Sequence, residues 1–289
     1  MLSAPAPAKL NLFLHITGRR ADGYHTLQTL FQLLDYGDQL HFAPRADGQL
    51  RLDSALSGIA ADDNLVMRAA RLLQSRARSL GQNPGADIHL DKRLPLGGGL
   101  GGGSSDAATT LLALNKLWRL DLPLDELAAL GLGLGADVPV FVLGRSAWAE
   151  GVGEELRPVD LPETCYLVLA PPCEVSTARV FSTPELTRNT LPITIAAFRA
   201  EGGRNDCEPA VRNQYPEVAK ALDWLNKFSP SRMTGSGACV FAAFADAEYA
   251  HAVLAQRPQG FQGFVARGVN HSPAHRALGY DGHPSSGFV

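Results

Sequence analysis

The sequence predicts two lobes that each combine β-strands with α-helices. The chain has 289 residues, of which 45% are hydrophobic, whereas single domains usually span about 100 to 200 residues. Strand-like and helix-like periodicities occur in both halves, and a connector with prolines at positions 158 and 162 separates them. We therefore expect an N-terminal lobe of residues 1–157 and a C-terminal lobe of residues 158–289.

The composition favours an enzyme that acts on a small molecule. The formal net charge is −3 and the basic residues are scattered, so the basic patch of a nucleic-acid-binding protein is missing. The four cysteines lie far apart without metal-site spacing, which is typical of reduced thiols. The N-terminal stretch lacks signal-peptide features, and the apolar segment 128–143 contains Asp137 and several glycines, which disfavours a membrane span. We expect a cytoplasmic protein without nucleic-acid or membrane partners.

The first strand and the turn after it are candidates for ligand binding. Residues 8–16 alternate, with Leu10 facing the core and Lys9 and Asn11 on the opposite face, which predicts a half-buried strand. Residues 18–25 combine charged side chains with an Asp-Gly pair, as exposed turns do. We expect this turn to be a binding loop.

Helical and strand-like periods continue along the rest of the chain. In the first lobe we expect a helix that opens at residues 62–64 and extends to about Ser79, a strand at 86–90, a helix that begins at Ser104 or Ser105, another helix-like segment after 118–123, and a strand and glycine turn at 147–153. In the second lobe we expect strands at 166–170 and 240–244 and helices near 193–199 and 218–228.

The glycine-rich loop of residues 95–106 is the sharpest feature of the sequence. Glycines let backbone N–H groups crowd around an anion, and the following helix start adds the positive end of its dipole, so the loop predicts a phosphate site. The spacing Gly97 to Gly102 matches the dinucleotide fingerprint, but the βαβ context is missing. The spacing Gly98 to Gly103 matches a Walker A loop, but Ser104 stands where that loop needs a lysine. A flexible linker is the structural alternative.

A phosphate loop without its own lysine must obtain positive charge elsewhere, and Lys9 and Lys92 are the candidates. The alternative for Lys9 is a solvated lysine on an edge strand. Asp137 lies in apolar surroundings at a helix start, where it is either a general base for phosphoryl transfer or an N-cap. Gly235 and Gly237 form a second glycine loop, which either makes a tight hairpin turn or helps to hold a ligand between the lobes.

In this order the motifs resemble those of the galactokinase, homoserine kinase, mevalonate kinase and phosphomevalonate kinase (GHMP) superfamily, at residues 7–15, 95–108 and 234–241. Further matches at residues 7–12, 20–25, 95–105, 135–139 and 268–270 resemble the branch that phosphorylates a cytidyl diphosphate derivative of methylerythritol. The resemblance spans nearly the whole chain. It implies an α+β fold with an N-terminal lobe like ribosomal protein S5 domain 2 and a C-terminal, ferredoxin-like α/β sandwich lobe.

The resemblance also implies a reaction, in which the γ-phosphoryl group of ATP, with Mg²⁺, is transferred to the 2-hydroxyl of 4-diphosphocytidyl-2-C-methyl-D-erythritol in the non-mevalonate isoprenoid pathway. By motif position, Asp137 corresponds to the catalytic aspartate, which Lys9 would keep ionised so that it orients or accepts the hydroxyl proton. The implied ATP-binding residues are Asn64, Leu65, Lys92, Pro95, Leu96, Gly97, Gly98, Gly99, Leu100, Gly101, Gly102, Gly103, Ser104 and Ser105. The implied substrate-binding residues are Asn11, Tyr24, His25, Thr177, Phe181, Gly235, Ser236 and Gly237.

Within the implied substrate site, Tyr24 and Phe181 would enclose the cytosine and His25 would bond its polar edge. Another GHMP kinase, acting on homoserine, mevalonate or a sugar, would share the phosphate loop but lack this set. A ligand sensor on the same fold is the second alternative, against which Lys9 and Asp137 argue. We expect a monomer or weak homodimer, no function for the polar tail after Ala277, and mobility of that tail.

Overall fold

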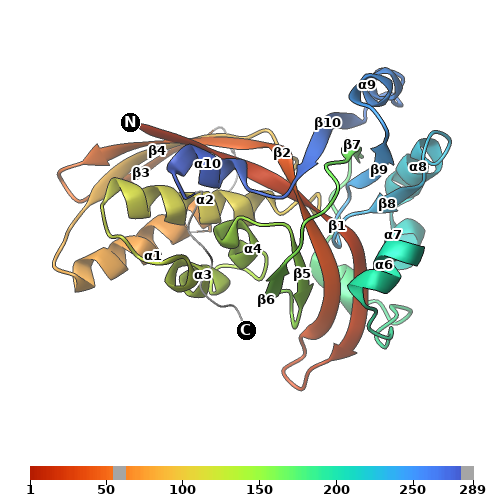
Figure 1. Ribbon diagram of the computed structural model, residues 1–289, viewed down its shortest axis with the longest axis horizontal. Coiled ribbons are helices and arrows are strands. Elements are labelled where there is room, and N and C mark those ends of the chain that lie inside the picture. Colours follow the sequence, from red (N-terminus) through yellow and green to blue (C-terminus); the bar gives the residue numbers. More distant parts are fainter. Residues whose placement is uncertain (55–62, 281–289) are drawn as a thin grey trace.

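A single twisted sheet of ten strands runs through both lobes of the protein (Figure 1). The computed structural model describes residues 1–54 and 63–280, and it confirms the predicted α+β class. The main path of the sheet runs β3-β4-β2-β10-β7-β9-β8, with β1 and the β5–β6 hairpin attached to β2. Because β10 pairs with both β2 and β7, the two lobes share one sheet.

Two long antiparallel strands, β1 (Leu2–Arg19) and β2 (His25–Arg45), form the framework of the first lobe. The strand predicted at residues 8–16 is confirmed as the middle of β1, but the expectation that one face is exposed is wrong, because every residue from 8 to 16 is buried. Helix α2 packs against β1, and the backbone around Asn205 together with the Thr234 hydroxyl group of the second lobe covers its free edge. Alternation alone does not reveal such a second cover.

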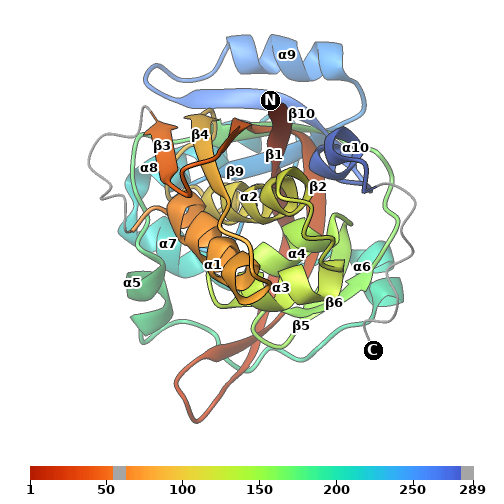
Figure 2. The same ribbon diagram turned by 90° about the vertical axis from the view of Figure 1, so that its left-hand side faces the viewer.

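The remaining strands of the first lobe extend this framework, and five helices pack against it. The strands are β3 (Leu50–Ser54), β4 (Gly85–Asp91), β5 (Ala147–Glu150) and β6 (Glu155–Pro158). The helices are α1 (Leu65–Ser79), α2 (Gly102–Leu117), α3 (Leu124–Leu132), α4 (Val138–Leu143) and α10 (Pro273–Leu278). Figure 2 shows α1, α2 and α3 together on one side of β3 and β4, where a large apolar core lies between them. The predicted elements here are confirmed with small shifts at their ends; Asp62, proposed as the first capping residue of α1, lies outside the described residues.

The second lobe contains β7 (Cys165–Ala170), β8 (Ser231–Met233), β9 (Val240–Phe244) and β10 (Gln262–Val269), with α5 (Thr177–Ser182), α6 (Ile195–Glu201), α7 (Glu208–Gln214), α8 (Pro216–Leu225) and α9 (Ala247–Ala255). The strands predicted at 166–170 and 240–244 are confirmed, and the two predicted helices are displaced by a few residues. This lobe has its own apolar core, and a third cluster around Phe13, Trp148 and Phe241 lies between the two cores.

Helix α2 begins at Gly102, so the expected start at Ser104 or Ser105 is wrong. Gly101 holds the N-cap position with a φ of 72°, a left-handed conformation that glycine adopts without strain. The glycine loop therefore supplies the first turn of the helix itself. The N-cap residue makes no side-chain hydrogen bond, so no capping side chain accepts from the first backbone N–H groups, those of Gly102, Gly103 and Ser104.

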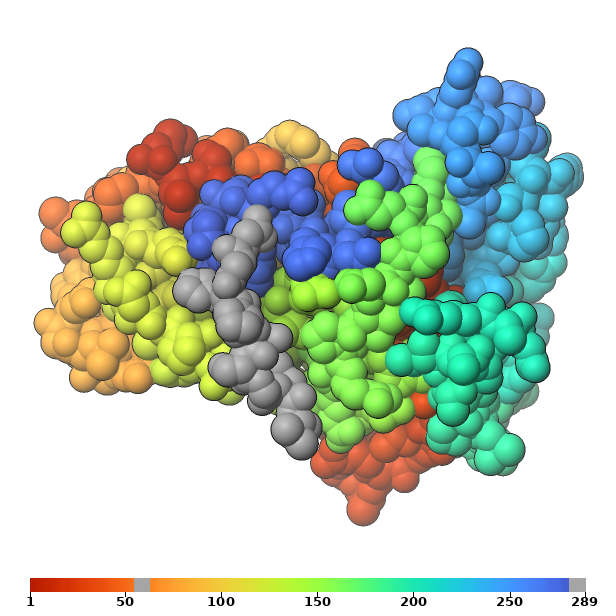
Figure 3. Space-filling view, viewed as in Figure 1, coloured from red at the N-terminus to blue at the C-terminus, as the bar shows by residue number. Residues whose placement is uncertain are grey.

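The C-terminal end returns to the first lobe, where Figure 3 shows the blue C-terminal residues lying against the yellow and green helices. Tyr280 is 5% exposed, and its hydroxyl group donates to the carbonyl oxygen of Leu112 and accepts from the amide of Asn115. The expectation of a mobile tail is therefore wrong at Tyr280, because the tyrosine ring fills the core beside α2; the rest of the tail, residues 281–289, lies outside the described residues. Among the helices that the structure describes, none is long and apolar enough to span a membrane.

Candidate active site

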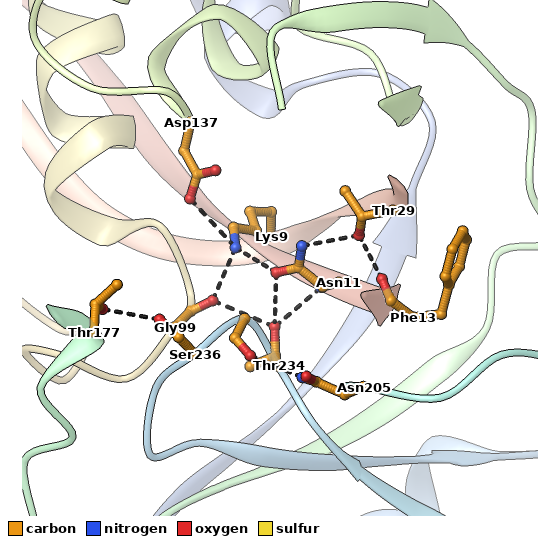
Figure 4. A network of polar contacts seen from close by, with 11 residues as sticks. Lys9, Asn11, Phe13, Thr29, Gly99, Asp137, Thr177, Asn205, Thr234 and Ser236 are labelled. Atoms are coloured by element: carbon orange, nitrogen blue, oxygen red, sulfur yellow. Dashed lines mark hydrogen bonds and ion pairs between the residues drawn. The ribbon is translucent and has the colours of Figure 1, made fainter. Parts of the chain in front are cut away.

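A cleft of about 770 Å³ brings together both proposed catalytic residues and most of the proposed substrate-binding residues. It is lined by β1 and β2, the β1–β2 turn, the glycine loop, the turn before α4, helix α5 and the second glycine loop. In Figure 4, Asp137 lies above Lys9, Asn11 lies to the right of Lys9, and Gly99 and Ser236 lie below it and to the left. Of the predicted site residues, the cleft is lined by Lys9, Asn11, Tyr24, His25, Gly99, Ser104, Asp137, Thr177, Phe181, Gly235 and Ser236.

Lys9 is the centre of the polar network in this cleft. Its side chain is 3% exposed, and its ammonium group lies 3.4 Å from Asp137 Oδ2. The same Nζ donates to Asn11 Oδ1 at 2.5 Å and to the Gly99 carbonyl oxygen at 3.0 Å, and it lies over the Phe31 ring. These contacts exclude the solvated edge-strand alternative. A buried cation with fixed acceptors on three sides is positioned rather than free to move.

Asp137 occupies the N-cap position of α4, but its side chain accepts no hydrogen bond from that helix. The carboxylate instead faces Lys9 and remains 34% exposed to the cleft. The N-cap alternative is therefore not supported, since the group that would cap the helix points to the lysine. Lys9 therefore holds one side of the Asp137 carboxylate, and the exposed part of the carboxylate is open to an incoming molecule in the cleft.

Asn11 anchors the network through hydrogen bonds to Thr29 and Thr234. Its side-chain amide donates to Thr29 Oγ1 at 2.9 Å, and its backbone N–H donates to Thr234 Oγ1 at 3.0 Å. Thr234 is completely buried and also donates to the Gly99 carbonyl at 3.3 Å. Thr29 and Thr234 are therefore positioning residues for the site, and no local motif around Thr29 indicates this.

The two glycine loops dock on each other through their backbones. Cys239 N donates to the Gly98 carbonyl at 3.0 Å and Ala238 N donates to the Gly97 carbonyl at 3.4 Å. A Cβ atom at Gly237 would collide with the backbone of the first loop, so glycine is required by this close approach. Asn205, which sequence analysis did not identify, holds the second loop by donating to the carbonyls of Met233 and Gly235. The second loop is the hairpin connection between β8 and β9, as one of the two alternatives predicted, and it also docks on the first loop and lines the cleft.

The remaining predicted nucleotide residues surround the start of α2 rather than the cleft. Asn64 caps α1 by accepting from Val66 N at 2.9 Å, and the next residue, Leu65, lies against Gly103. Leu96 is 48% exposed, whereas Leu100 and Ser105 are buried, and the Ser105 hydroxyl has no hydrogen-bond partner among the described residues. Pro95, Gly97, Gly98, Gly101, Gly102 and Gly103 complete this loop around the helix start.

Lys92 forms a buried ion-pair network at the base of the loop. Its ammonium group lies 2.6 Å from Asp38 Oδ2 and 2.6 Å from Asp106 Oδ2. Burial raises the pKa of Asp106 to about 7, and the negative charge of Asp38 adds to this rise, while the positive charge of Lys92 opposes it. Burial alone would lower the pKa of Lys92, but the two carboxylates raise it overall. Lys92 is therefore bound to protein carboxylates rather than free to contact a phosphate.

The far end of the cleft carries the aromatic residues. The His25 and Phe181 rings have centroids 5.0 Å apart, while Tyr24, the neighbouring residue on the turn, is 68% exposed. Burial lowers the pKa of His25, and the positive charges of Arg188 and Arg19 lower it further. Thr177 on α5 makes a hydroxyl contact of 2.8 Å with Ser236. A neutral imidazole beside the Phe181 ring is suited to a planar, uncharged group such as a nucleobase.

Comparison with known proteins agrees with this geometry. Family models described as GHMP kinases N terminal domain and GHMP kinases C terminal match residues 64–145 and 192–262. The chain is 59% identical over 277 residues to the 4-diphosphocytidyl-2-C-methyl-D-erythritol kinase of Pseudomonas paraeruginosa, with 96% of this chain and 97% of that one covered. The kinase of the same name from Halorhodospira halophila is 57% identical over 277 residues, with 95% of each chain covered.

Solved structures give the same result at the level of the fold. A crystal structure of a 4-(cytidine 5'-diphospho)-2C-methyl-D-erythritol kinase matches with a TM-score of 0.80 and 34% identity, covering 93% of this chain and 100% of that one. The mevalonate kinase of Methanococcus jannaschii shares the fold with a TM-score of 0.68 at 16% identity, covering 93% of this chain and 98% of that one. The predicted two-lobe GHMP kinase fold is thereby confirmed. The chain belongs to the GHMP kinases and, within them, to the 4-diphosphocytidyl-2-C-methyl-D-erythritol kinase family.

Proposed function

We propose that this small-molecule kinase transfers the γ-phosphoryl group of ATP to the 2-hydroxyl of 4-diphosphocytidyl-2-C-methyl-D-erythritol, a step of the non-mevalonate route to isoprenoid precursors. The observation that carries the proposal is one cleft that runs from Gly99 and the Lys9–Asp137 pair to the pocket of His25 and Phe181. ATP phosphates at the glycine loop and a cytidine at the aromatic end leave the methylerythritol between them, beside Asp137.

Asp137 acts on the attacking hydroxyl group in this proposal. The hydroxyl oxygen forms a bond to the γ-phosphorus while the bond to the β,γ-bridging oxygen breaks, so ADP leaves and the hydroxyl proton passes to the Asp137 carboxylate. Lys9 stabilises the negative charge that accumulates on the transferred group, and Asn11 and the Gly99 carbonyl hold its ammonium group in place. Asn11 also lines the cleft, where it can reach the methylerythritol hydroxyls.

The start of α2 binds the ATP phosphates, because its first backbone N–H groups lack a side-chain cap and the helix dipole favours an anion there. Asn64 and Leu65, at the start of the neighbouring helix α1, are assigned to the adenosine end. Lys92 supports nucleotide binding through the position of α2, since both of its carboxylate partners occupy its ammonium group. Tyr24, exposed on its turn, covers the cytosine opposite Phe181.

The residues of the cleft fit a Mg²⁺ ion that is held mainly by ATP. Mg²⁺ prefers oxygen ligands and is often bound by one or two protein groups together with substrate phosphates. Within the described residues there is no cluster of three His, Cys, Asp or Glu side chains that could form a protein cage. The Ser104 hydroxyl lines the cleft and would supply a protein oxygen. When bound, the ion neutralises phosphate charge.

Asp137→Asn tests the proposed base. We expect a loss of kcat of about 10²- to 10⁴-fold, which is the usual contribution of a general base, with the Kd of the cytidyl substrate within a few-fold of wild type. Substrate is identified in a coupled ADP-release assay with the cytidyl compound, mevalonate, homoserine and galactose side by side. Near-wild-type turnover by Asp137→Asn would show that the carboxylate is not the base.

Asp160→Asn provides the matched control, because this carboxylate is 75% exposed and pairs with Arg145 outside the cleft. It should leave kcat unchanged. ADP release with mevalonate, homoserine or galactose in place of the cytidyl compound would replace the proposed substrate. Nucleotide binding without ADP release on any substrate would indicate a sensor instead of a kinase.

A further inference from the structure

Arg188 forms a hydrogen bond to the imidazole of His25 and has no role in the reaction proposed above. Its Nε donates to His25 Nε2 at 3.1 Å across 163 positions of sequence. Its Nη1 donates to the carbonyls of Pro184 and Leu186, and its Nη2 donates to those of Phe181 and Thr183. A guanidinium group has five N–H donors, and here each of them has an acceptor.

Resting on the proposed function, we propose that Arg188 determines base specificity by fixing His25 as the neutral tautomer with its proton on Nδ1, so that His25 presents an N–H donor that accepts cytosine and rejects uracil. Arg188 touches no substrate in this scheme. It is a positioning residue that acts through His25.

The tautomer follows from the chemistry of the two side chains. A guanidinium group carries donors and no acceptor, so His25 Nε2 can share a hydrogen bond with Arg188 Nε when it carries a lone pair and no proton. A neutral imidazole then has its proton on Nδ1. His25 Nδ1 has no hydrogen-bond partner among the described residues, and it is not enclosed by protein. The donor is therefore available to a ligand in the cleft that His25 lines.

The charges around the imidazole act in the same direction. Burial lowers the pKa of His25, and the cations Arg188 and Arg19 add to this effect. The nearest acidic side chain on the same turn, Asp22, is engaged by the backbone N–H of Tyr24 and by Arg20. Addition of a second proton would place a cation against the Arg188 guanidinium group, so the doubly protonated form is disfavoured at neutral pH.

Arg188 also couples the imidazole to the aromatic wall. Four of its donors bind carbonyls in the segment from Phe181 to Leu186, which begins with the aromatic residue that faces His25. The guanidinium group therefore fixes the spacing of Phe181 and His25, whose ring centroids are 5.0 Å apart. A planar base that stacks on Phe181 meets the His25 donor at its edge.

Cytosine and uracil differ at N3, the ring atom that such a donor would contact. Cytosine has two adjacent acceptors, O2 and N3, whereas uracil has O2 and an N3–H donor. A fixed Nδ1–H donor pairs with cytosine N3 but opposes the N–H of uracil, and an unmade hydrogen bond in a desolvated pocket lowers affinity by about 10- to 100-fold. A histidine free to change tautomer would accept from uracil N3–H and lose this discrimination.

Arg188→Gln tests the inference, because glutamine can donate or accept and so no longer dictates the tautomer. We expect the KM for the cytidine diphosphate-linked substrate to rise about 10- to 100-fold, kcat at saturation to stay within about threefold, and the preference over the uridine diphosphate-linked analogue to fall by a similar factor. The kcat/KM of the variant should also acquire a pH dependence near the ordinary histidine pKa of about 6.5. Arg179→Gln is the control, since Arg179 lies on α5 near Tyr215 and makes no contact with His25.

Nitrogen NMR of the wild-type protein provides a direct measurement that does not depend on turnover. The His25 ring should show a protonated Nδ1 and an unprotonated Nε2, both free and with cytidine monophosphate bound. A protonated Nε2 in the wild type, or an unchanged base preference in a folded Arg188→Gln protein, would overturn the inference. If Arg188→Gln does not fold, the NMR result decides. Absence of turnover on the cytidyl substrate by the wild type would refute the proposed function, while the tautomer and the binding preference for cytidine over uridine monophosphate would still test Arg188.

Discussion

Replacing Lys92 with Met tests how the glycine loop is anchored. Lys92 follows β4 just before the loop, Asp106 lies in α2 just after it, and Asp38 belongs to β2. The ammonium group lies 2.6 Å from a carboxylate oxygen of each aspartate, and the side chains of Lys92, Asp38 and Asp106 are 9%, 0% and 4% exposed. Because the same cation binds a strand of the sheet and the helix after the loop, it fixes both ends of the glycine loop.

The cost of Lys92→Met can be worked from these contacts. Each hydrogen bond to a charged group contributes about 1.5–3 kcal/mol, so two of them give about 3–6 kcal/mol. The variant no longer buries an ammonium group, and Asp38 keeps the backbone N–H donors of Arg93 and Leu94 at 2.6 and 2.7 Å, which offsets part of the loss. Removing one partner of a buried ion pair typically costs about 3–5 kcal/mol. We therefore expect the free energy of unfolding to fall by about 3–5 kcal/mol at pH 7.

Urea denaturation monitored by circular dichroism measures this loss, provided that the m-value is unchanged. Lys220→Met, on an exposed position of α8, is the matched control and should stay within about 0.5 kcal/mol of wild type. In an Asp106→Asn background the same change should cost about half as much, since one of the two bonds is already weakened. A loss below about 1 kcal/mol, relative to the expected range, would refute the anchoring role. An equal loss in both backgrounds would show that Asp106 is not coupled to Lys92.

Three further changes give separate tests. The pKa of Asp106 is about 7 in the folded protein and lower in the unfolded chain, so its contribution to stability is present at acidic pH and is lost as the pH rises toward 7. Asp106→Asn should therefore flatten the decline in the free energy of unfolding between pH 4 and 7, as measured by urea titrations. An unchanged slope in the variant would contradict this expectation. Tyr280→Phe removes the hydroxyl bond to the Leu112 carbonyl, and it should cost about 1 kcal/mol in the same assay, whereas no cost would indicate a loosely packed ring. Gly99→Ala places a Cβ against the Thr234 carbonyl at a φ of 76°, so the KM for ATP should rise and stability should fall by more than about 1 kcal/mol, and unchanged values of both would show that the loops are not tightly docked.

Much of the local structure could be predicted from the sequence because it depends on short-range patterns. The order of strand, glycine loop and helix follows from periodicity and from the glycines themselves, and only the start of α2 was misplaced, since glycine has too weak a helical preference to indicate that it opens the helix. The burial of Lys9 could not be predicted in this way. Its alternating strand looks half-exposed, and the groups that cover its free edge come from residues about 200 positions later.

The candidate site residues could be predicted from family resemblance more than from the spacing of residues in the sequence. Lys9 and Asp137 are 128 positions apart, and no local pattern places them 3.4 Å from each other. Asn205 and Arg188 were missed for the same physical reason, because each acts by hydrogen bonds to distant backbone or ring atoms. A lone polar residue in a loop carries no periodic signal. The assignment of roles to the site residues stays a prediction.

The position of Lys9 can be understood from the docking of the two glycine loops. A side chain at Gly99 of the first loop would collide with the backbone of the second loop, and a side chain at Gly237 of the second loop would collide with the first. Strand β1 lies next to this junction, and its Lys9 side chain reaches the Gly99 carbonyl oxygen and Asp137. Thr234 completes the junction by bonding both to β1 and to the first loop. Close packing of the loops therefore excludes a side chain at Gly99, and the Gly99 carbonyl that this packing fixes is one of the acceptors of Lys9.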